Sequence, residues 1–417
     1  MENCAYQPTP FLDVKYWLVG VCGTSVCVVG MAANAFLLTI LMKDKLRQSY
    51  LMYLSVLALL DIGILSTYVA VFSVQIFYDK FEMVWLYVAW VHYIPVLYFV
   101  SKVVLLAQTY LIVAVTGERF VEVARIHSTA NHGVSYRERW CIIGVVIIFA
   151  VTFRLPVLWE LQTERVPNCT GFAAWRTDQT ELAQLELYLK GYNIWADNIV
   201  RVFVPFCTLL VLNFLIITRW KKTLAPPSTT SALLKYGLMP AEQVLVNNQA
   251  FLDYSINNNG TNSNQEAIDR EARRQGLKAA TKMMIAIVTS YLICNLLNLV
   301  ITVWEHIDRD YLKHDGYRFY TLTADVVSLL VIVNSTVRLP IYYLCNPIIR
   351  FGVGESIKSV RYCLLRVKRP GVDEALETET MLSSPGCDAN GMASLQANDL
   401  ASPRVLEQLE EEEKDWL

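Results

Sequence analysis

Seven long apolar runs constrain this 417-residue chain more than any other feature. Each run reaches roughly the 20 residues that an α-helix needs to cross the hydrocarbon core of a bilayer. Hydrophobic residues make up 54% of the chain and charged residues 18%, unlike an ordinary soluble domain. We therefore predict an all-α membrane protein, a seven-transmembrane helix bundle. The runs cover about 16–42, 51–77, 86–121, 140–161, 194–220, 279–307 and 319–345.

Charged residues between the runs predict the direction in which the chain crosses the membrane. Lysines and arginines follow runs one, three, five and seven and precede run six. All of them fall on one face if the runs cross in turn, and the positive-inside rule makes that face cytoplasmic. We predict a multi-pass protein of the plasma membrane, with its N-terminus extracellular and its C-terminus cytoplasmic.

Four segments follow from the runs. Residues 1–15 form a short extracellular lead, and 16–345 form the bundle. Within the bundle, 223–276 is a long third intracellular loop that we predict to be disordered, because it is rich in Pro, Ser, Asn and Gly. Residues 346–367 are predicted to form a short amphipathic helix that lies on the membrane lipid, and the acidic tail 368–417 is predicted to be disordered.

Side chains outside the runs include candidate modification sites. Cys363, near the end of the amphipathic segment, is a candidate for palmitoylation. Asn168 begins an Asn-Cys-Thr glycosylation sequon. Four hydroxyls set among acids in the tail are candidate sites for phosphorylation, which would add negative charge; the alternative is a solvated tail. They are Thr378, Thr380, Ser383 and Ser384.

The third run ends in the triplet Glu118-Arg119-Phe120. An acid and an arginine at the mouth of a membrane helix are costly to place there, which indicates a function. Glu118 can neutralise the Arg119 guanidinium through a charge-assisted hydrogen bond. The alternative is a salt bridge that anchors the helix among lipid headgroups. The triplet resembles the Asp/Glu-Arg-Tyr triplet of rhodopsin-like G protein-coupled receptors, in which the arginine meets the G protein.

Polar residues inside other runs extend this resemblance. Asn34 and Asp61 match the polar pair of the first two spans of rhodopsin-like receptors. The stretch from Asn334 to Tyr342 resembles their Asn-Pro-x-x-Tyr region, with Arg338 in place of the asparagine. In relatives the buried acid of span two holds a sodium ion. We predict that Arg338 pairs with Asp61 and occupies the sodium site; the alternative is that Arg338 points elsewhere and sodium still binds.

Spans five and six depart from the common pattern. Asn295 replaces the usual tryptophan of span six, the following proline is missing, and Asn213 stands where span five usually has tyrosine. No acid of span six faces Arg119, so Glu118 alone should hold it. These departures resemble invertebrate FMRFamide-type neuropeptide receptors. The resemblance implies a peptide ligand and a heterotrimeric G protein as partners.

The family usually joins the top of span three to the second extracellular loop by a disulfide. The span-three position falls near Ile94, and no cysteine lies there. The loop cysteine is present as Cys169, and Cys4 is the one other cysteine clearly outside. Since the outside is oxidising, these two cysteines can form a disulfide bridge. The alternative is that both remain free thiols.

The resemblance also places a ligand pocket among the extracellular ends of the spans. Aromatic rings and acids there suit a cationic, aromatic peptide end such as Arg-Phe-amide. The alternatives are an interfacial aromatic belt for any single ring and a non-peptide small ligand for the pocket. Lys102 pairs either with a protein acid or with a ligand carboxylate or carbonyl. The candidates are Tyr93, Tyr98, Ser101, Lys102, Trp304, Glu305 and Asp325.

We expect a population shift in which ligand binding swings span six outward and exposes Arg119 to a G protein. Two other hypotheses remain: a receptor without signalling of its own, and a transporter or channel with a charge relay through Asp61, Arg119, Arg154, Arg338 and Lys102. GxGxxG, GxxxxGK, HExxH and GxSxG are absent, and no cysteines have metal-ligand spacing. We therefore expect no enzyme, cofactor or metal site, and the net charge of −2 indicates no nucleic-acid partner.

Overall fold

The computed structural model describes residues 4, 6, 8–42, 51–124, 134–224, 261–307, 317–346, 349–354 and 356–358, with side chains undescribed at 193, 194, 220–224 and 261–277. The chain divides into two compact units, Met1–Ile341 and Tyr342–Leu417. In the described ranges, seven helical stretches are long and apolar enough to cross a membrane, as predicted. They are Leu12–Leu41, Leu51–Lys80, Val84–Ala124, Tyr136–Trp159, Ile199–Arg219, Lys278–Ile307 and Tyr317–Cys345.

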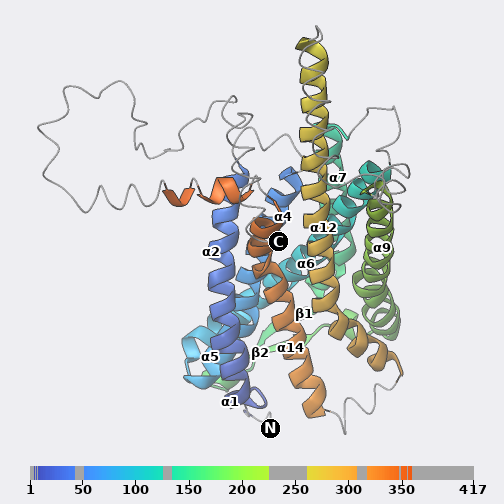
Figure 1. Cartoon of the computed structure of the whole chain (residues 1–417). Helices are drawn as coiled ribbons and strands as arrows, with labels where there is room; N and C mark the ends of the chain where they lie inside the picture. Colours follow the sequence, from blue (N-terminus) through green and yellow to red (C-terminus); the bar gives the residue numbers. More distant parts are fainter. Residues whose placement is uncertain are drawn as a thin grey trace, which may run out of the picture. The chain divides into compact units, whose positions relative to one another are not determined.

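Most spans combine an α-helix with a π- or 3₁₀-helical segment. Figure 1 labels α-helices of each span. Span one consists of α1 (Leu12–Lys15), η1 (Tyr16–Gly23) and α2 (Thr24–Leu41), and span two of α4 (Leu51–Tyr68), η2 (Val69–Ser73) and α5 (Val74–Lys80). Span three is α6 (Val84–Ala124), and span four is α7 (Tyr136–Arg154) with η3 (Leu155–Trp159). Span five consists of η5 (Leu187–Ala196), η6 (Ile199–Phe203) and α9 (Val204–Leu224). Span six is α12 (Thr261–Ile307), and span seven is α14 (Tyr317–Thr336) with α15 (Arg338–Cys345).

Local sequence explains where two of these helices begin and end. Ser135 and Glu138 form a capping box that satisfies free backbone N–H groups at the start of α7. Pro340 has no N–H, and its ring crowds the carbonyl four residues earlier, on Thr336. The helix of span seven is interrupted there: α14 ends at Thr336, and α15 begins at Arg338.

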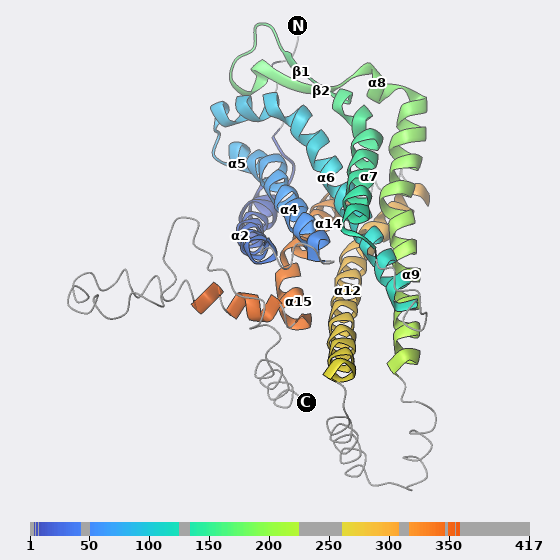
Figure 2. The same ribbon diagram turned by 90° about the horizontal axis from the view of Figure 1, so that it is seen from above.

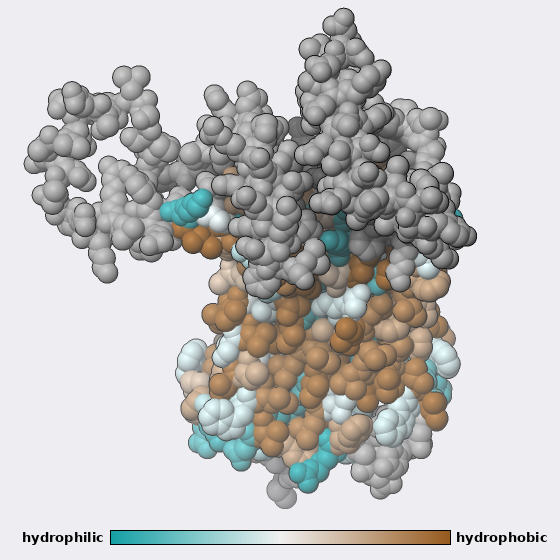
Figure 3. Space-filling view, viewed as in Figure 1, coloured by the Kyte–Doolittle hydropathy of each residue, from teal (hydrophilic) through white to brown (hydrophobic). Residues whose placement is uncertain are grey.

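Helix α6 lies at the centre of the first unit, where it contacts α4, α7, α9 and α12. Helix α2 packs against α4 and α14, and Gly30 permits this close approach. A Cβ atom at Gly30 would lie 2.3 Å from Thr336 Oγ1 and 2.8 Å from Leu65 Cδ1. Figure 3 shows hydrophobic side chains over the middle of the helices on this face, which suits contact with lipid tails.

A two-stranded antiparallel hairpin covers one end of the helices (Figure 2). Its strands are β1 (Leu161–Arg165) and β2 (Trp175–Gln179), with η4 (Gly171–Ala174) between them and α8 (Glu181–Gln184) after them. Thr163 Oγ1 donates to the Val91 carbonyl at 2.9 Å, and Tyr87 Oη donates to the Trp175 carbonyl at 2.8 Å. These bonds tie both strands to α6. We call this the hairpin end; the sequence analysis predicted no strands there.

The predicted loop 223–276 is too long at both ends. Helix α9 continues to Leu224, and α12 begins at Thr261, so residues 261–276 are helical rather than disordered. The sequence from Gln265 to Leu277 is rich in Ala, Glu, Gln, Arg and Leu, and these strong helix formers favour extension of the span.

The second unit contains part of the predicted amphipathic helix. Residues 349–354 and 356–358, within the predicted 346–367, are helical. Cys363 and the acidic tail with its four hydroxyl candidates lie outside the described residues.

Candidate functional site

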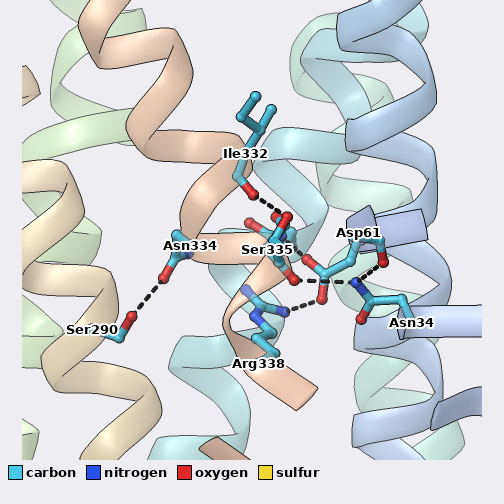
Figure 4. Close-up of polar contacts among 10 residues, drawn as sticks. Asn34, Asp61, Ser290, Ile332, Asn334, Ser335 and Arg338 are labelled. Carbon is cyan, nitrogen blue, oxygen red and sulfur yellow. Dashed lines mark hydrogen bonds and ion pairs between the residues drawn. The ribbon is translucent and has the colours of Figure 1, made fainter. Parts of the chain in front are cut away.

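Asp61 and Arg338 form an ion pair in the middle of the first unit (Figure 4). Arg338 Nη1 lies 2.9 Å from Asp61 Oδ2, and the side chains are 1% and 0% exposed. Gln108 Nε2 donates to the other carboxylate oxygen at 2.5 Å and to Ser335 Oγ at 3.1 Å. The structure thus brings together the two charges that the sequence analysis paired. Removing either partner would leave a buried charge uncompensated, at a cost of about 3–5 kcal/mol.

The other predicted core residues divide between separate contacts. Asn34 Nδ2 donates to the Gly30 and Ser335 carbonyls at 2.9 and 3.1 Å, which joins spans one and seven. Asn334 points away from Asp61 and accepts a 3.2 Å bond from Ser290 Oγ on α12 (Figure 4).

Asn295 does not join this core. It is half-buried, and its amide donates to the Tyr291 carbonyl one turn earlier on its own helix at 2.9 Å. The prediction of one buried polar core is therefore wrong at this position. A short amide side chain can bond the backbone of its own helix, and this local partner removes the need for a distant one.

Gln108 is the core residue that the sequence analysis missed. It lies in the apolar stretch of α6, among buried neighbours. A buried amide needs hydrogen-bond partners, so a glutamine inside a membrane run by itself indicates a polar contact with another span.

The charges at the far end of α6 pair differently from the prediction. Glu118 Oε1 accepts bonds from Arg139 Nε and Nη2 of α7 at 3.0 and 2.9 Å. Arg119 Nη1 lies 2.5 Å from Glu122 Oε2. The prediction that Glu118 alone holds Arg119 is therefore wrong. Adjacent helical residues project in different directions, whereas residues three apart share a face, so Glu122 is well placed for Arg119.

Three further predicted switch residues have different surroundings. Phe120 is half-buried on α6. Asn213 Nδ2 of α9 donates to Thr289 Oγ1 of α12 at 3.3 Å, which links spans five and six. Tyr342 lies on α15 and belongs to the second unit.

The chain's N-terminal residues are fastened to the hairpin end. Cys4 and Cys169 form a disulfide, with their Cα atoms 5.6 Å apart. The structure thus shows the bridge rather than free thiols. Asn168, the glycosylation candidate, is exposed beside it in a left-handed conformation, with φ 65°.

Asp79, at the end of span two, holds the same N-terminal residues by hydrogen bonds. It accepts bonds from Tyr6 Oη, from Thr9 Oγ1 and, at 3.0 Å, from the Thr9 backbone N–H. The Tyr6 ring stacks on Phe172 with centroids 4.8 Å apart. Burial and the bond to Asp79 raise the pKa of the Tyr6 phenol above its usual value. We call the described residues from Cys4 to Lys15 the N-terminal strap.

The predicted ligand-pocket residues have different surroundings. Tyr93 Oη donates to the Ala70 carbonyl of span two at 2.9 Å. Asp325 pairs with Lys15 of the strap at 3.3 Å, so the strap already neutralises this carboxylate. The Trp304 ring lies 5.7 Å from the Phe319 ring, and Glu305 and Ser101 are half-buried. Lys102 Nζ lies 4.8 Å from the centre of the Tyr98 ring.

A charged cluster that the sequence analysis did not assemble lies where spans four and five approach the hairpin end. Arg154 Nη2 of α7 lies 2.5 Å from Asp197 Oδ1, and Arg201 Nε lies 3.4 Å from Asp197 Oδ2. Asp197 and Arg201 are four residues apart in the fifth run, a spacing that indicates a helical ion pair.

The relay hypothesis finds no continuous path in this geometry. Four of its five proposed members occupy three separate ion pairs, Asp61–Arg338, Arg119–Glu122 and Arg154–Asp197, and the fifth, Lys102, lies against the Tyr98 ring. Within the described ranges, no group of three or more His, Cys, Asp or Glu side chains could hold a metal ion.

Comparison with known proteins identifies the class to which this geometry belongs. The model of the 7 transmembrane receptor family (rhodopsin family) matches residues 33–343. The chain therefore belongs to the rhodopsin family of G protein-coupled receptors, and it is a seven-span membrane receptor rather than an enzyme.

One relative narrows the comparison. The FMRFamide receptor of Drosophila melanogaster is 22% identical over 396 residues, which cover 92% of this chain. The chain spans 61% of the length of that protein.

Proposed function

We propose that this chain is a plasma-membrane receptor for an extracellular neuropeptide, of the amidated Arg-Phe type, and that it signals through a heterotrimeric G protein. The observation that carries the proposal is Arg119, which is buried at the end of α6 and held by Glu122. An ion pair with an acid of its own helix suits an arginine that exchanges its partner when a G protein binds. Similarity to the Drosophila FMRFamide receptor supports the ligand class.

The hairpin end faces outward in this proposal, and Arg119 faces the cytoplasm. A Cys4–Cys169 disulfide suits an oxidising, extracellular location. The basic residues near Arg119, including Arg137 and Arg139, suit the cytoplasmic side.

Activation is a shift between two populated states. Contacts between span six and its neighbours include the hydrogen bonds Asn213–Thr289 at 3.3 Å and Ser290–Asn334 at 3.2 Å. These are uncharged contacts, which suits a helix that swings outward at modest cost. The outward swing exposes Arg119 to the G protein, and the sequence assigns Tyr342 to the same contact. Receptor kinase and arrestin would act on the tail.

Arg338 takes the place of the sodium ion in this mechanism. Its guanidinium supplies the positive charge beside Asp61 as a permanent part of the chain. The pair can then hold spans two and seven together without regard to sodium concentration.

A panel of amidated Arg-Phe peptides, applied to cells that express the full chain, tests the function with G protein activation as the readout. Arg119→Ala should abolish the response. Arg137→Ala, an exposed arginine at the start of α7, is the matched control and should respond normally. Silence of the wild-type receptor to every peptide, with surface expression measured, would refute the neuropeptide proposal and favour a receptor without signalling of its own.

A further inference from the structure

Positively charged side chains outnumber acidic ones near the hairpin end of spans four and five. Asp197 contacts both Arg154 and Arg201, and Lys102 of α6 lies within electrostatic range of the same carboxylate. We call these four residues the Asp197 cluster. It holds three cations and one acid.

Among the residues that the structure describes, neighbouring acids do not fully neutralise this excess of positive charge. Glu160 is a second carboxylate in this region, because Tyr192 lies within electrostatic range of both Glu160 and Asp197, and Glu160 accepts a 2.7 Å hydrogen bond from Tyr188 Oη. Even with Glu160 counted, three cations share two acids. Lys102 lies against the Tyr98 ring, a contact that stabilises an ammonium group without neutralising it.

Arg154 carries the strongest sign of an unfilled site. Its side chain is 2% exposed. Its Nε has no hydrogen-bond partner among the described residues. A buried donor without a partner is costly, and a surplus cation in a membrane span adds to that cost. Such an arrangement is stable when an anion binds.

We propose that the Asp197 cluster is a subsite for a carboxylate of the peptide ligand, and this inference rests on the proposed function. Guanidinium groups match carboxylates because two N–H groups can donate in parallel. An amidated peptide has no terminal carboxylate, so the anion is an Asp or Glu side chain. The receptor therefore selects peptides that carry an acidic residue before the Arg-Phe-amide end.

Two cations of the cluster are not fully buried. Arg201 is 31% exposed in its side chain, and Lys102 is half-buried. Arg201 is also within electrostatic range of Tyr291 on span six, so a ligand held here lies beside the span that moves. Occupation of the subsite can therefore be coupled to activation.

The test uses pairs of amidated Arg-Phe peptides that differ only by Asp or Asn at one position before the Arg-Phe end. Every position is scanned, and G protein activation and surface expression are measured. At one position, the wild-type receptor should respond to the Asp peptide at a concentration at least tenfold lower. Lys102→Gln and Arg201→Gln should each remove most of that preference, measured as the ratio between the two effective concentrations on the same variant.

Charge reversal and a control variant complete the experiment. Lys102→Glu should favour a peptide with Lys at the selected position over the Asp peptide. Lys190→Gln, an exposed lysine at the same end, should keep the wild-type preference. Equal responses to Asp and Asn peptides at every position, or a preference that survives both Gln variants, would overturn the subsite while the proposed function stands. Silence to all peptides refutes the function itself, and the subsite with it.

Discussion

Removal of the Arg338 side chain should make the stability of this receptor depend on sodium. Asp61 is fully buried, and Arg338 is its cationic partner at 2.9 Å. Loss of one partner from a buried ion pair costs about 3–5 kcal/mol. Gln108 would still donate to the carboxylate, so we expect a value near the lower limit, about 3 kcal/mol, for Arg338→Met.

Arg338→Asn should lose stability for the same reason as Arg338→Met. Sodium should restore part of the stability of Arg338→Asn, because a small cation can enter the vacated space and neutralise Asp61. The assay is thermal unfolding of the purified receptor in sodium chloride or choline chloride at equal ionic strength. In choline the variant should unfold on the order of 5 °C lower than wild type. Sodium should raise its Tm by several degrees and leave wild type unchanged.

The double variant Asp61→Asn/Arg338→Met supplies the control. With both charges removed, it should be more stable than either single variant, because no charge remains buried without a partner. The reasoning is refuted if wild-type Tm rises with sodium as much as that of Arg338→Asn, or if Arg338→Met unfolds within 1 °C of wild type in choline.

Three further predictions follow from the contacts. Glu122→Gln should raise ligand-independent G protein activation several-fold, and more than Glu118→Gln, because Glu122 contacts Arg119; the reverse order would contradict the assignment. Cys4→Ser and Cys169→Ser should each cost about 2–4 kcal/mol, seen as a lower Tm, and the double variant should match either single one. Gly30→Ala should reduce the surface-expressed receptor severalfold, because its Cβ would overlap the adjacent threonine of α14.

Partners for buried charges were predictable where the membrane left few choices. Asp61 and Arg338 are charges inside apolar runs, and each needs an opposite charge nearby. At the end of α6 several acids and arginines lie close in sequence, so adjacency suggested Glu118 for Arg119. The rotation of α6 instead directs Glu118 toward Arg139 of the neighbouring helix.

The sequence by itself determined the seven spans, because only helices satisfy all their backbone hydrogen bonds within a bilayer. It also limited the disulfide to Cys4 and Cys169, the two cysteines on the face that the positive-inside rule predicts to be extracellular. Only the tertiary structure decided that Asp79 accepts hydrogen bonds from the N-terminal strap, and that side chains of three spans meet in the Asp197 cluster. Hydrophobic length reports that a helix crosses the membrane, but it carries little information on helix rotation and relative height. Packing sets both, and they determine which polar side chains meet.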